Sequence, residues 1–306
     1  MMGLFFFARM GSDTRKGNRK DGQSRMVRAI FLDIDGTLRD ERSGVPESAA
    51  RAIGMCRDQG IRIVICTGRN MASIQRDVKA LEPDGIISGG GCFIWDRGEV
   101  LKNVHFQYAN IRDWIRELLR KGAPLSMESQ EKIFMNQAAA LWFKQDFERK
   151  LAGLGDREKE QRRREQGICY EDTMGEYKGE QDQVHKICVW CPVGEALAAA
   201  SMAEERGSII QQGKLPDGTW YMELLPEGCG KGAAIREWCG LKHILPGDTM
   251  SFGDGRNDID MMKATGIGVA MGDGDEELKR YASSVCGAAA EDGIYRELVR
   301  RGVIAG

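Results

Sequence analysis

The sequence lacks a strong net charge and a long apolar segment. Its 44 lysines and arginines nearly balance its 46 aspartates and glutamates, so the formal net charge is −2. This balance argues against a nucleic-acid-binding surface that covers the whole protein. The apolar run at residues 4–8 is far too short to span a membrane, and no basic segment precedes it. We therefore expect no nucleic-acid partner, no membrane anchor and no signal peptide.

The sequence also lacks a paired cysteine framework. Its nine cysteines are scattered and odd in number, and Cys66 and Cys188 lie inside apolar runs. This pattern is typical of a reducing compartment, so we expect a cytoplasmic protein. Cys188 and Cys191 have the spacing of a redox pair, but they lie in a strand-like run. Redox activity is not expected there, because a thiolate would need the start of a helix to stabilise it.

The most informative segment is residues 28–38, Arg-Ala-Ile-Phe-Leu-Asp-Ile-Asp-Gly-Thr-Leu. An apolar strand ends there in Asp33 and Asp35, and Gly36 allows a sharp turn. Open α/β sheets bind ligands at such strand ends, and two carboxylates this close favour a Mg²⁺-dependent phosphate site. An EF-hand loop is excluded, because it needs a third ligand before its glycine. A solvated acidic turn remains the simpler alternative for this segment alone.

A second apolar strand is predicted at residues 61–66, and Thr67 and Gly68 follow it directly. The next residues have a helical pattern. A hydroxyl group and free backbone N–H groups at a strand-to-helix junction form an anion site. This segment therefore predicts a place for a phosphate oxygen.

The C-terminal part repeats the pattern of a strand that ends in acidic residues. A strand predicted at residues 249–253 leads to Asp254, Asn257 and Asp258, while Lys231 opens a helix after a glycine-rich stretch. These residues add two carboxylates and a cation to the predicted site. A plain helix N-cap is the alternative role for Asn257 and Asp258.

Strands and helices alternate at both ends of the chain, which predicts an α/β fold with a parallel sheet covered on both faces. The predicted strands are 27–32, 61–66, 85–88, 249–253, 267–270 and 284–286, and the helices are 46–59, 71–81, 231–239, 258–265, 276–282 and 292–299. A length of 306 residues suits two domains. We expect residues 1–25 to form a disordered extension, and residues 26–89 with 226–306 to form a catalytic core.

Between these parts, residues 90–225 have a different pattern. Short turns join the predicted strands, which favours a mainly antiparallel sheet with helices on one side. The strands are expected at 124–129, 132–136, 185–190, 208–212 and 219–225, and the helices near 111–119, 141–151 and 195–205. Residues 157–165 are densely charged and are interpreted as a solvated face. This insert is predicted to be an α+β domain.

The ordered motifs Asp-x-Asp-Gly-Thr, Thr-Gly-Arg, Lys and Gly-Asp-x-x-Asn-Asp resemble those of the haloacid dehalogenase-like (HAD) superfamily. The tail segments 266–272, 276–279 and 291–294 are similar to the Cof-type sugar-phosphatase subfamily. The resemblance implies a Rossmann-like, doubly wound parallel-sheet core with an inserted α+β cap domain. Two departures occur: Gly90-Gly91-Cys92 replaces the usual Asn-Gly-Ala, and Met271-Gly272-Asp273 replaces the common Met-Gly-Asn.

The resemblance also implies a role for each motif residue. Asp33 would be the nucleophile, and Asp35 would protonate the leaving alcohol and then activate water. Four residues would hold the phosphoryl group: Thr67, Gly68, Lys231 and Asn257. Mg²⁺ would be bound by Asp33, the backbone carbonyl of Asp35 and Asp254. Asp258 would orient Lys231 or a metal-bound water.

These roles predict a Mg²⁺-dependent phosphatase that hydrolyses small phosphorylated metabolites, above all sugar phosphates, through an aspartyl-phosphate intermediate. A phosphomutase or a specialised sugar-phosphate phosphatase is an alternative within the same fold. A non-catalytic phosphometabolite sensor is an alternative of another class, which the intact Asp33 and Asp35 pair argues against. The expected partner is a small phosphate ester, and the expected state is a monomer or a weak homo-oligomer.

Overall fold

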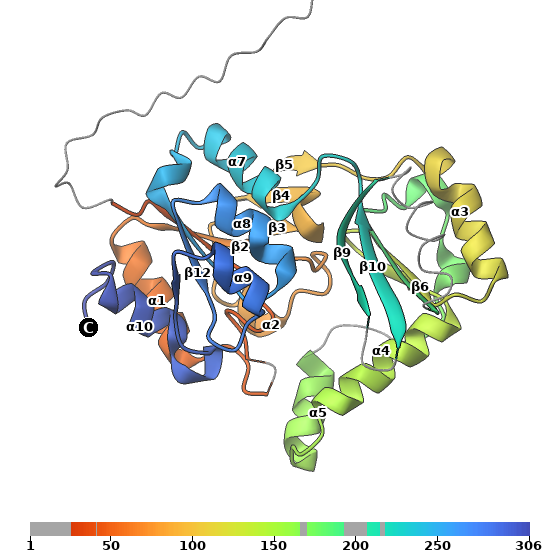
Figure 1. Cartoon of the computed structure of the whole chain (residues 1–306), viewed down its shortest axis with the longest axis horizontal. Coiled ribbons are helices and arrows are strands. Elements are labelled where there is room, and N and C mark those ends of the chain that lie inside the picture. Colours follow the sequence, from red (N-terminus) through yellow and green to blue (C-terminus); the bar gives the residue numbers. More distant parts are fainter. Residues whose placement is uncertain (1–25, 41, 166–169, 193–206, 215–217) are drawn as a thin grey trace, which may run out of the picture.

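A computed structural model describes residues 26–40, 42–165, 170–192, 207–214 and 218–306 (Figure 1). The expected extension at 1–25 and the expected helix at 195–205 lie outside these residues. The described residues form two sheets that lie side by side, and each sheet has its own helices. In the part of the chain that is described, no helix is both long and apolar enough to span a bilayer.

The larger sheet has the strand order β13-β12-β11-β1-β2-β3-β4-β5. Its first six strands pair in parallel, which confirms the predicted α/β core. Every side chain of β1 is buried, as expected for a strand covered on both faces. The six strands are β1 (Ala29–Leu32), β2 (Arg62–Cys66), β3 (Gly85–Ser88), β11 (Thr249–Gly253), β12 (Ile267–Ala270) and β13 (Ser284–Val285).

Helices cover both faces of this sheet (Figure 1). One face packs on α1 (Glu47–Asp58) and α10 (Gly293–Arg300), and the other packs on α7 (Lys231–Leu241), α8 (Ile259–Ala264) and α9 (Glu276–Tyr281). Short 3₁₀ turns lie between the regular elements, at Gly89–Gly91, Met174–Glu176, Gly179–Gln181, Pro246–Asp248, Arg256–Asp258 and Ala289–Glu291. The doubly wound arrangement places the carboxyl ends of β1, β2 and β11 next to one another.

The hairpin of β4 (Phe93–Asp96) and β5 (Glu99–Asn103) corrects the predicted start of the insert at residue 90. These strands extend the larger sheet in antiparallel fashion instead of joining the smaller one. Their turn is Arg97 and Gly98, which both have positive φ. A two-residue turn of this kind matches the twist of paired strands, so a tight hairpin forms.

Helix α2 (Arg76–Lys79) is shorter than the predicted helix over 71–81. The residues before it bind the neighbouring sheet instead of one another. The Asn70 side chain donates to the Ser129 carbonyl at 2.6 Å, and the Ala72 N–H donates to the Gln130 carbonyl at 3.0 Å. The bond of Ala72 satisfies a backbone N–H that a helix would otherwise satisfy locally, and the bond of Asn70 holds the segment in place.

The smaller sheet is antiparallel throughout, as predicted, with the order β7-β6-β8-β10-β9. Its helices, however, do not share one side: α3 (Tyr108–Arg120) packs on one face, and α4 (Gln137–Lys150) packs against Trp190 on the other. The charged segment forms α5 (Asp156–Glu165). The strands are β6 (Leu125–Glu128), β7 (Ile133–Met135), β8 (Lys186–Pro192), β9 (Ser208–Lys214) and β10 (Thr219–Leu225).

The chain crosses between the two sheets at one place. Cys92 packs against Leu225 and Cys229, and its carbonyl accepts the Val104 N–H at 2.9 Å. Next to it, Gly91 has a φ of +100°, and a Cβ there would lie 2.2 Å from the carbonyl oxygen of a facing glycine in the return crossing. Only glycine tolerates both this conformation and this approach.

Candidate active site

Lys231 and two carboxylates form a buried ion cluster under the ends of β1 and β11. The Lys231 ammonium lies 2.6 Å from Asp33 Oδ1 and 2.6 Å from Asp258 Oδ1. Lys231 is only 3% exposed, so the lysine charge is almost fully removed from water. Burial raises the pKa of Asp33 well above its usual value, and the lysine charge opposes this rise.

Asp258 fixes the acidic loop that follows β11. Its second carboxylate oxygen, Oδ2, accepts the backbone N–H groups of Asp254 and Gly255 at 3.0 and 3.1 Å. One carboxylate therefore both orders the loop and holds Lys231. Asp258 precedes α8 but makes no side-chain cap bond to it, so its predicted orienting role rests on the contact with Lys231.

Asp254 completes a set of carboxylates that could hold a metal. Ligand atoms of Asp33, Asp254 and Asp258 all lie within 4.8 Å of one another. Burial, and then the charge of Asp258, raise the pKa of Asp254 to about 7, which indicates a carboxylate short of positive charge. Carboxylate oxygens are the ligands that Mg²⁺ prefers, so these residues fit this ion. The side chain of Asp35 lies outside this set and binds Arg69 instead.

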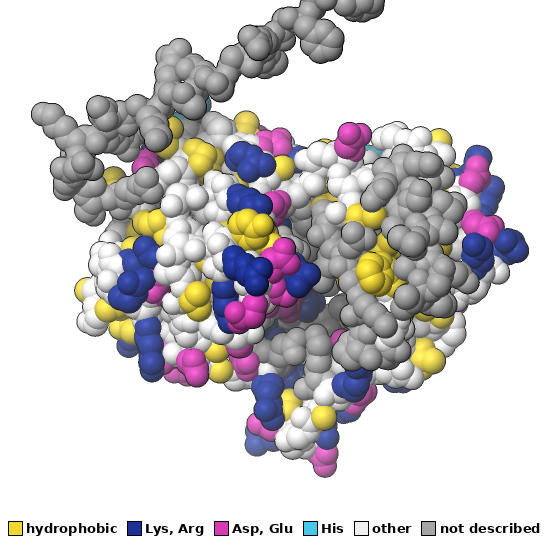
Figure 2. Space-filling view, in the orientation of Figure 1, with side chains coloured by type: hydrophobic (Ala, Val, Ile, Leu, Met, Phe, Trp, Pro, Cys, Tyr) yellow, Lys and Arg dark blue, Asp and Glu magenta, His cyan; other side chains and the backbone are white. Residues whose placement is uncertain are grey.

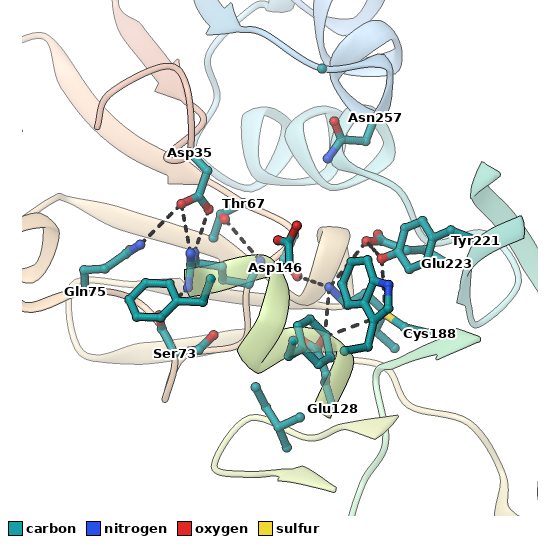
Figure 3. Close-up of a pocket in the computed structure, with 18 of the residues that line it drawn as sticks. Asp35, Thr67, Ser73, Gln75, Glu128, Asp146, Cys188, Tyr221, Glu223 and Asn257 are labelled. Carbon is teal, nitrogen blue, oxygen red and sulfur yellow. Dashed lines mark hydrogen bonds and ion pairs between the residues drawn. The ribbon is translucent and has the colours of Figure 1, made fainter. Parts of the chain in front are cut away.

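Asp35 is held by Arg69, a residue of the Thr-Gly-Arg motif for which no separate role was predicted. The guanidinium donates from Nε and Nη2 to the two carboxylate oxygens at 2.6 and 2.9 Å. The Gln75 amide adds a bond of 3.3 Å (Figure 3). A bidentate pair fixes both the position and the plane of the carboxylate.

The loop of Thr67 and Gly68 contacts the smaller sheet through Lys186, which the sequence did not single out. The Lys186 ammonium donates to the Gly68 carbonyl at 2.9 Å and pairs with Glu128 at 3.1 Å. The Thr67 hydroxyl oxygen accepts the Arg69 N–H at 3.1 Å. A cation of β8 therefore lies against the predicted phosphate loop.

A cavity of about 510 Å³ joins these groups between the two sheets. Its lining includes six of the eight residues predicted from the sequence: Asp33, Asp35, Thr67, Gly68, Asp254 and Asn257. Of the other two, Lys231 is buried in contact with Asp33, and Asp258 is buried in contact with Lys231. Figure 3 shows Asp35, Thr67 and Asn257 around one end of the cavity, with Glu128, Tyr221 and Glu223 at the other.

The sequence profile of the haloacid dehalogenase-like hydrolases matches residues 30–298. The chain belongs to this family. One relative is YkrA of Bacillus subtilis (strain 168), which is named as a phosphatase. It is 28% identical over 266 residues, which are 87% of this chain and 94% of YkrA. The 5-amino-6-(5-phospho-D-ribitylamino)uracil phosphatase YwtE of the same organism is 25% identical, over 88% of this chain and 96% of YwtE.

Solved structures share the fold of this family member. The phosphatase BT1666 of Bacteroides thetaiotaomicron superposes with a TM-score of 0.73 at 24% identity, covering 94% of this chain and all of that one. The HAD subclass IIB sugar phosphatase BT4131 gives a TM-score of 0.71 at 24% identity, over 91% of this chain and all of BT4131. The chain is therefore a phosphatase-type hydrolase of the HAD fold with a cap.

Proposed function

We propose that this hydrolase cleaves phosphate monoesters of small metabolites, sugar phosphates among them, with Asp33 as nucleophile and Mg²⁺ as cofactor. The observation that carries the proposal is the contact of Asp33 with Lys231 in a carboxylate cluster at the floor of the cavity between the two sheets. A carboxylate beside a fixed cation can approach an anionic phosphoryl group, because the cation offsets their repulsion.

In the first step, an oxygen of Asp33 forms a bond to phosphorus while the bond from phosphorus to the leaving oxygen breaks. Asp35 donates a proton to that oxygen, and Arg69 keeps its carboxyl group in position. In the second step, Asp35 takes a proton from water, which attacks phosphorus and releases phosphate and the Asp33 carboxylate. Asp33, Asp254 and the backbone carbonyl of Asp35 would hold Mg²⁺, which neutralises phosphoryl charge when bound.

The remaining predicted residues bind the phosphoryl oxygens. We infer that Thr67, the Gly68 amide and Asn257 hold them from the cavity side, and that Lys231 contacts one from below. Asn257 lines the cavity, and its amide lies close to Gly68. The smaller sheet acts as a cap that closes the cavity, which excludes water from the reacting groups. A reducing cytosol, which the cysteine pattern favours, is the proposed location.

The decisive experiment compares Asp33→Asn with the matched control Asp58→Asn, whose residue lies exposed at the end of α1. Phosphate release from p-nitrophenyl phosphate and a sugar-phosphate panel is measured with Mg²⁺. Because an amide is not a nucleophile, we expect a loss of about a thousandfold or more for Asp33→Asn and none for the control. Unchanged phosphate release by a folded Asp33→Asn protein contradicts the proposal.

A further inference from the structure

The end of the cavity that is formed by the smaller sheet has an aromatic wall, defined here as Trp142, Phe143, Trp190 and Tyr221. Trp190 stands at its centre, with ring centroids 4.8 Å from Trp142, 5.1 Å from Phe143 and 5.0 Å from Tyr221. All four side chains line the cavity. Only Trp190 is fully buried, so the other three keep part of their surface open.

This wall is built from three elements, β8, β10 and α4, that meet on the face of the smaller sheet opposite α3. Trp190 in β8 and Tyr221 in β10 are directly paired across the strands. Trp142 and Phe143 are neighbours on α4 and pack onto them. Because alternate residues of a strand face opposite ways, Val189 and Met222 pack under α3 while Trp190 and Tyr221 face the cavity. The wall is therefore additional to the core that stabilises the sheet.

The polar groups beside the aromatic wall are largely bonded to one another. Lys186 pairs with Glu128, and the Tyr221 hydroxyl donates to Glu223 and lies 3.6 Å from Cys188 Sγ. Figure 3 shows Glu128, Cys188, Tyr221 and Glu223 together at this end of the cavity. This surface mainly offers flat aromatic faces, on which a planar ring can stack. The two carboxylates still have spare lone pairs, because each can accept about four hydrogen bonds.

We propose that the preferred substrates are phosphorylated sugars or sugar alcohols that carry a planar heteroaromatic ring, and that this ring packs on the aromatic wall. The phosphate lies at Asp33, the sugar spans the middle of the cavity, and Glu128 and Glu223 accept N–H groups from the ring edge. The cavity of about 510 Å³ falls within the usual range for ligands larger than a simple sugar phosphate. This inference rests on the proposed phosphatase function.

The test uses substrate pairs that differ only by the ring. Flavin mononucleotide is compared with ribitol 5-phosphate, and adenosine and uridine 5′-monophosphates with ribose 5-phosphate, by kcat/KM with Mg²⁺. Stacking of a ring on aromatic side chains predicts an advantage of about tenfold or more for at least one ring-bearing ester. If every ring-free ester is hydrolysed as well as its partner, the inference is wrong.

Two variants separate recognition from folding. Trp142→Leu and Phe143→Leu each remove an aromatic ring from the partly exposed part of the wall. We expect each variant to lower the ratio of kcat/KM for the ring-bearing ester to kcat/KM for its ring-free partner about tenfold. The kcat/KM for ribose 5-phosphate should stay within about twofold of the wild-type value. The matched control is Trp220→Leu in β10, because Trp220 packs with the α3 cluster on the other face of the sheet. An equal loss for both esters of a pair would show that the wall is only structural, and would overturn the inference.

A binding measurement keeps the inference distinguishable from the phosphatase proposal. Riboflavin, which has the ring but no phosphate, is titrated into the Asp33→Asn protein while its fluorescence is followed. We expect saturable quenching that weakens about tenfold in the Trp142→Leu background. Ring binding without hydrolysis of any ester by the wild type would refute the phosphatase function alone, whereas hydrolysis without ring binding would refute this inference alone.

Discussion

Replacing Lys231 by methionine tests whether the buried ion cluster is held together by that single cation. The methionine fills most of the volume but leaves Asp33 and Asp258 without their 2.6 Å partner. Removing one member of a buried ion pair costs about 3–5 kcal/mol, because the remaining charge stays buried without compensation. The control Lys102→Met removes a partly exposed pair with Glu237 at 3.0 Å, which is expected to cost at most about 1 kcal/mol.

The loss should also depend on pH, with a sign fixed by the raised pKa values. The folded protein binds protons at Asp33 and Asp254 more tightly than the unfolded chain does, since burial raises both pKa values. Their contribution to stability is therefore present at low pH and is lost as pH rises from about 4 through about 7. Without the lysine charge this loss grows, so the gap between wild type and Lys231→Met should widen from pH 5.5 to pH 8.

The assay is urea unfolding at these two pH values, in EDTA so that no divalent cation replaces the lysine charge. The free energy of unfolding is compared for wild type, Lys231→Met and Lys102→Met. A gap at pH 8 no larger than that of the control would refute the idea that Lys231 compensates the carboxylates. So would a gap that narrows as the pH rises.

Three further outcomes are expected. Because the Asp254 pKa is about 7, Mg²⁺ must displace a proton there when it binds. The Mg²⁺ affinity, measured by calorimetry, should therefore rise steeply up to about pH 7 and then level off. An affinity that stays constant from pH 5.5 to 8.5 contradicts this expectation. A lysine in the Arg69→Lys variant cannot hold both oxygens of Asp35. We therefore expect kcat to fall about tenfold for alkyl phosphates and less for p-nitrophenyl phosphate. Equal losses for both kinds of ester speak against a positioning role of Arg69. Gly91→Ala must push its Cβ into the Gly230 carbonyl at positive φ, so its melting temperature should fall by several degrees. The Cβ of Gly98→Ala meets no atoms, so the melting temperature of that variant should fall less. The reverse order would show that the crossing is not tightly packed.

The parts of the molecule that follow from short-range patterns could be predicted from the sequence. Strands β1, β2 and β11 are mainly apolar runs that end at polar motifs, so these strands and the grouping of Asp33, Thr67 and Asp254 at one sheet edge were accessible. The β4–β5 hairpin was missed, although its Arg97-Gly98 turn between two apolar segments was a usable signal. The glycines before it were interpreted as the start of the insert.

Contacts between residues that are distant in the chain could not be predicted. Trp142 and Trp190 lie on a helix and a strand far apart in the sequence, and no periodicity relates them. Lys186 appeared as one more polar residue at the start of a strand, yet it binds the Gly68 carbonyl across the two sheets. The length of α2 was predicted wrongly for the same reason, because a bond from Asn70 to Ser129, beside the other sheet, overrides a locally favourable helix.

The single crossing point around Cys92 makes the smaller sheet an exchangeable unit. The chain leaves the larger sheet at Val104 and returns near Leu225 and Cys229, and all of these contact Cys92. The two ends of the intervening region are therefore already neighbours, so a replacement of different length or fold need not stretch the larger sheet to be joined. The carboxylates proposed to be catalytic, and Lys231, stay outside the exchanged region. New specificities could thus arise by substituting one contiguous stretch of chain, while the reacting groups keep their geometry.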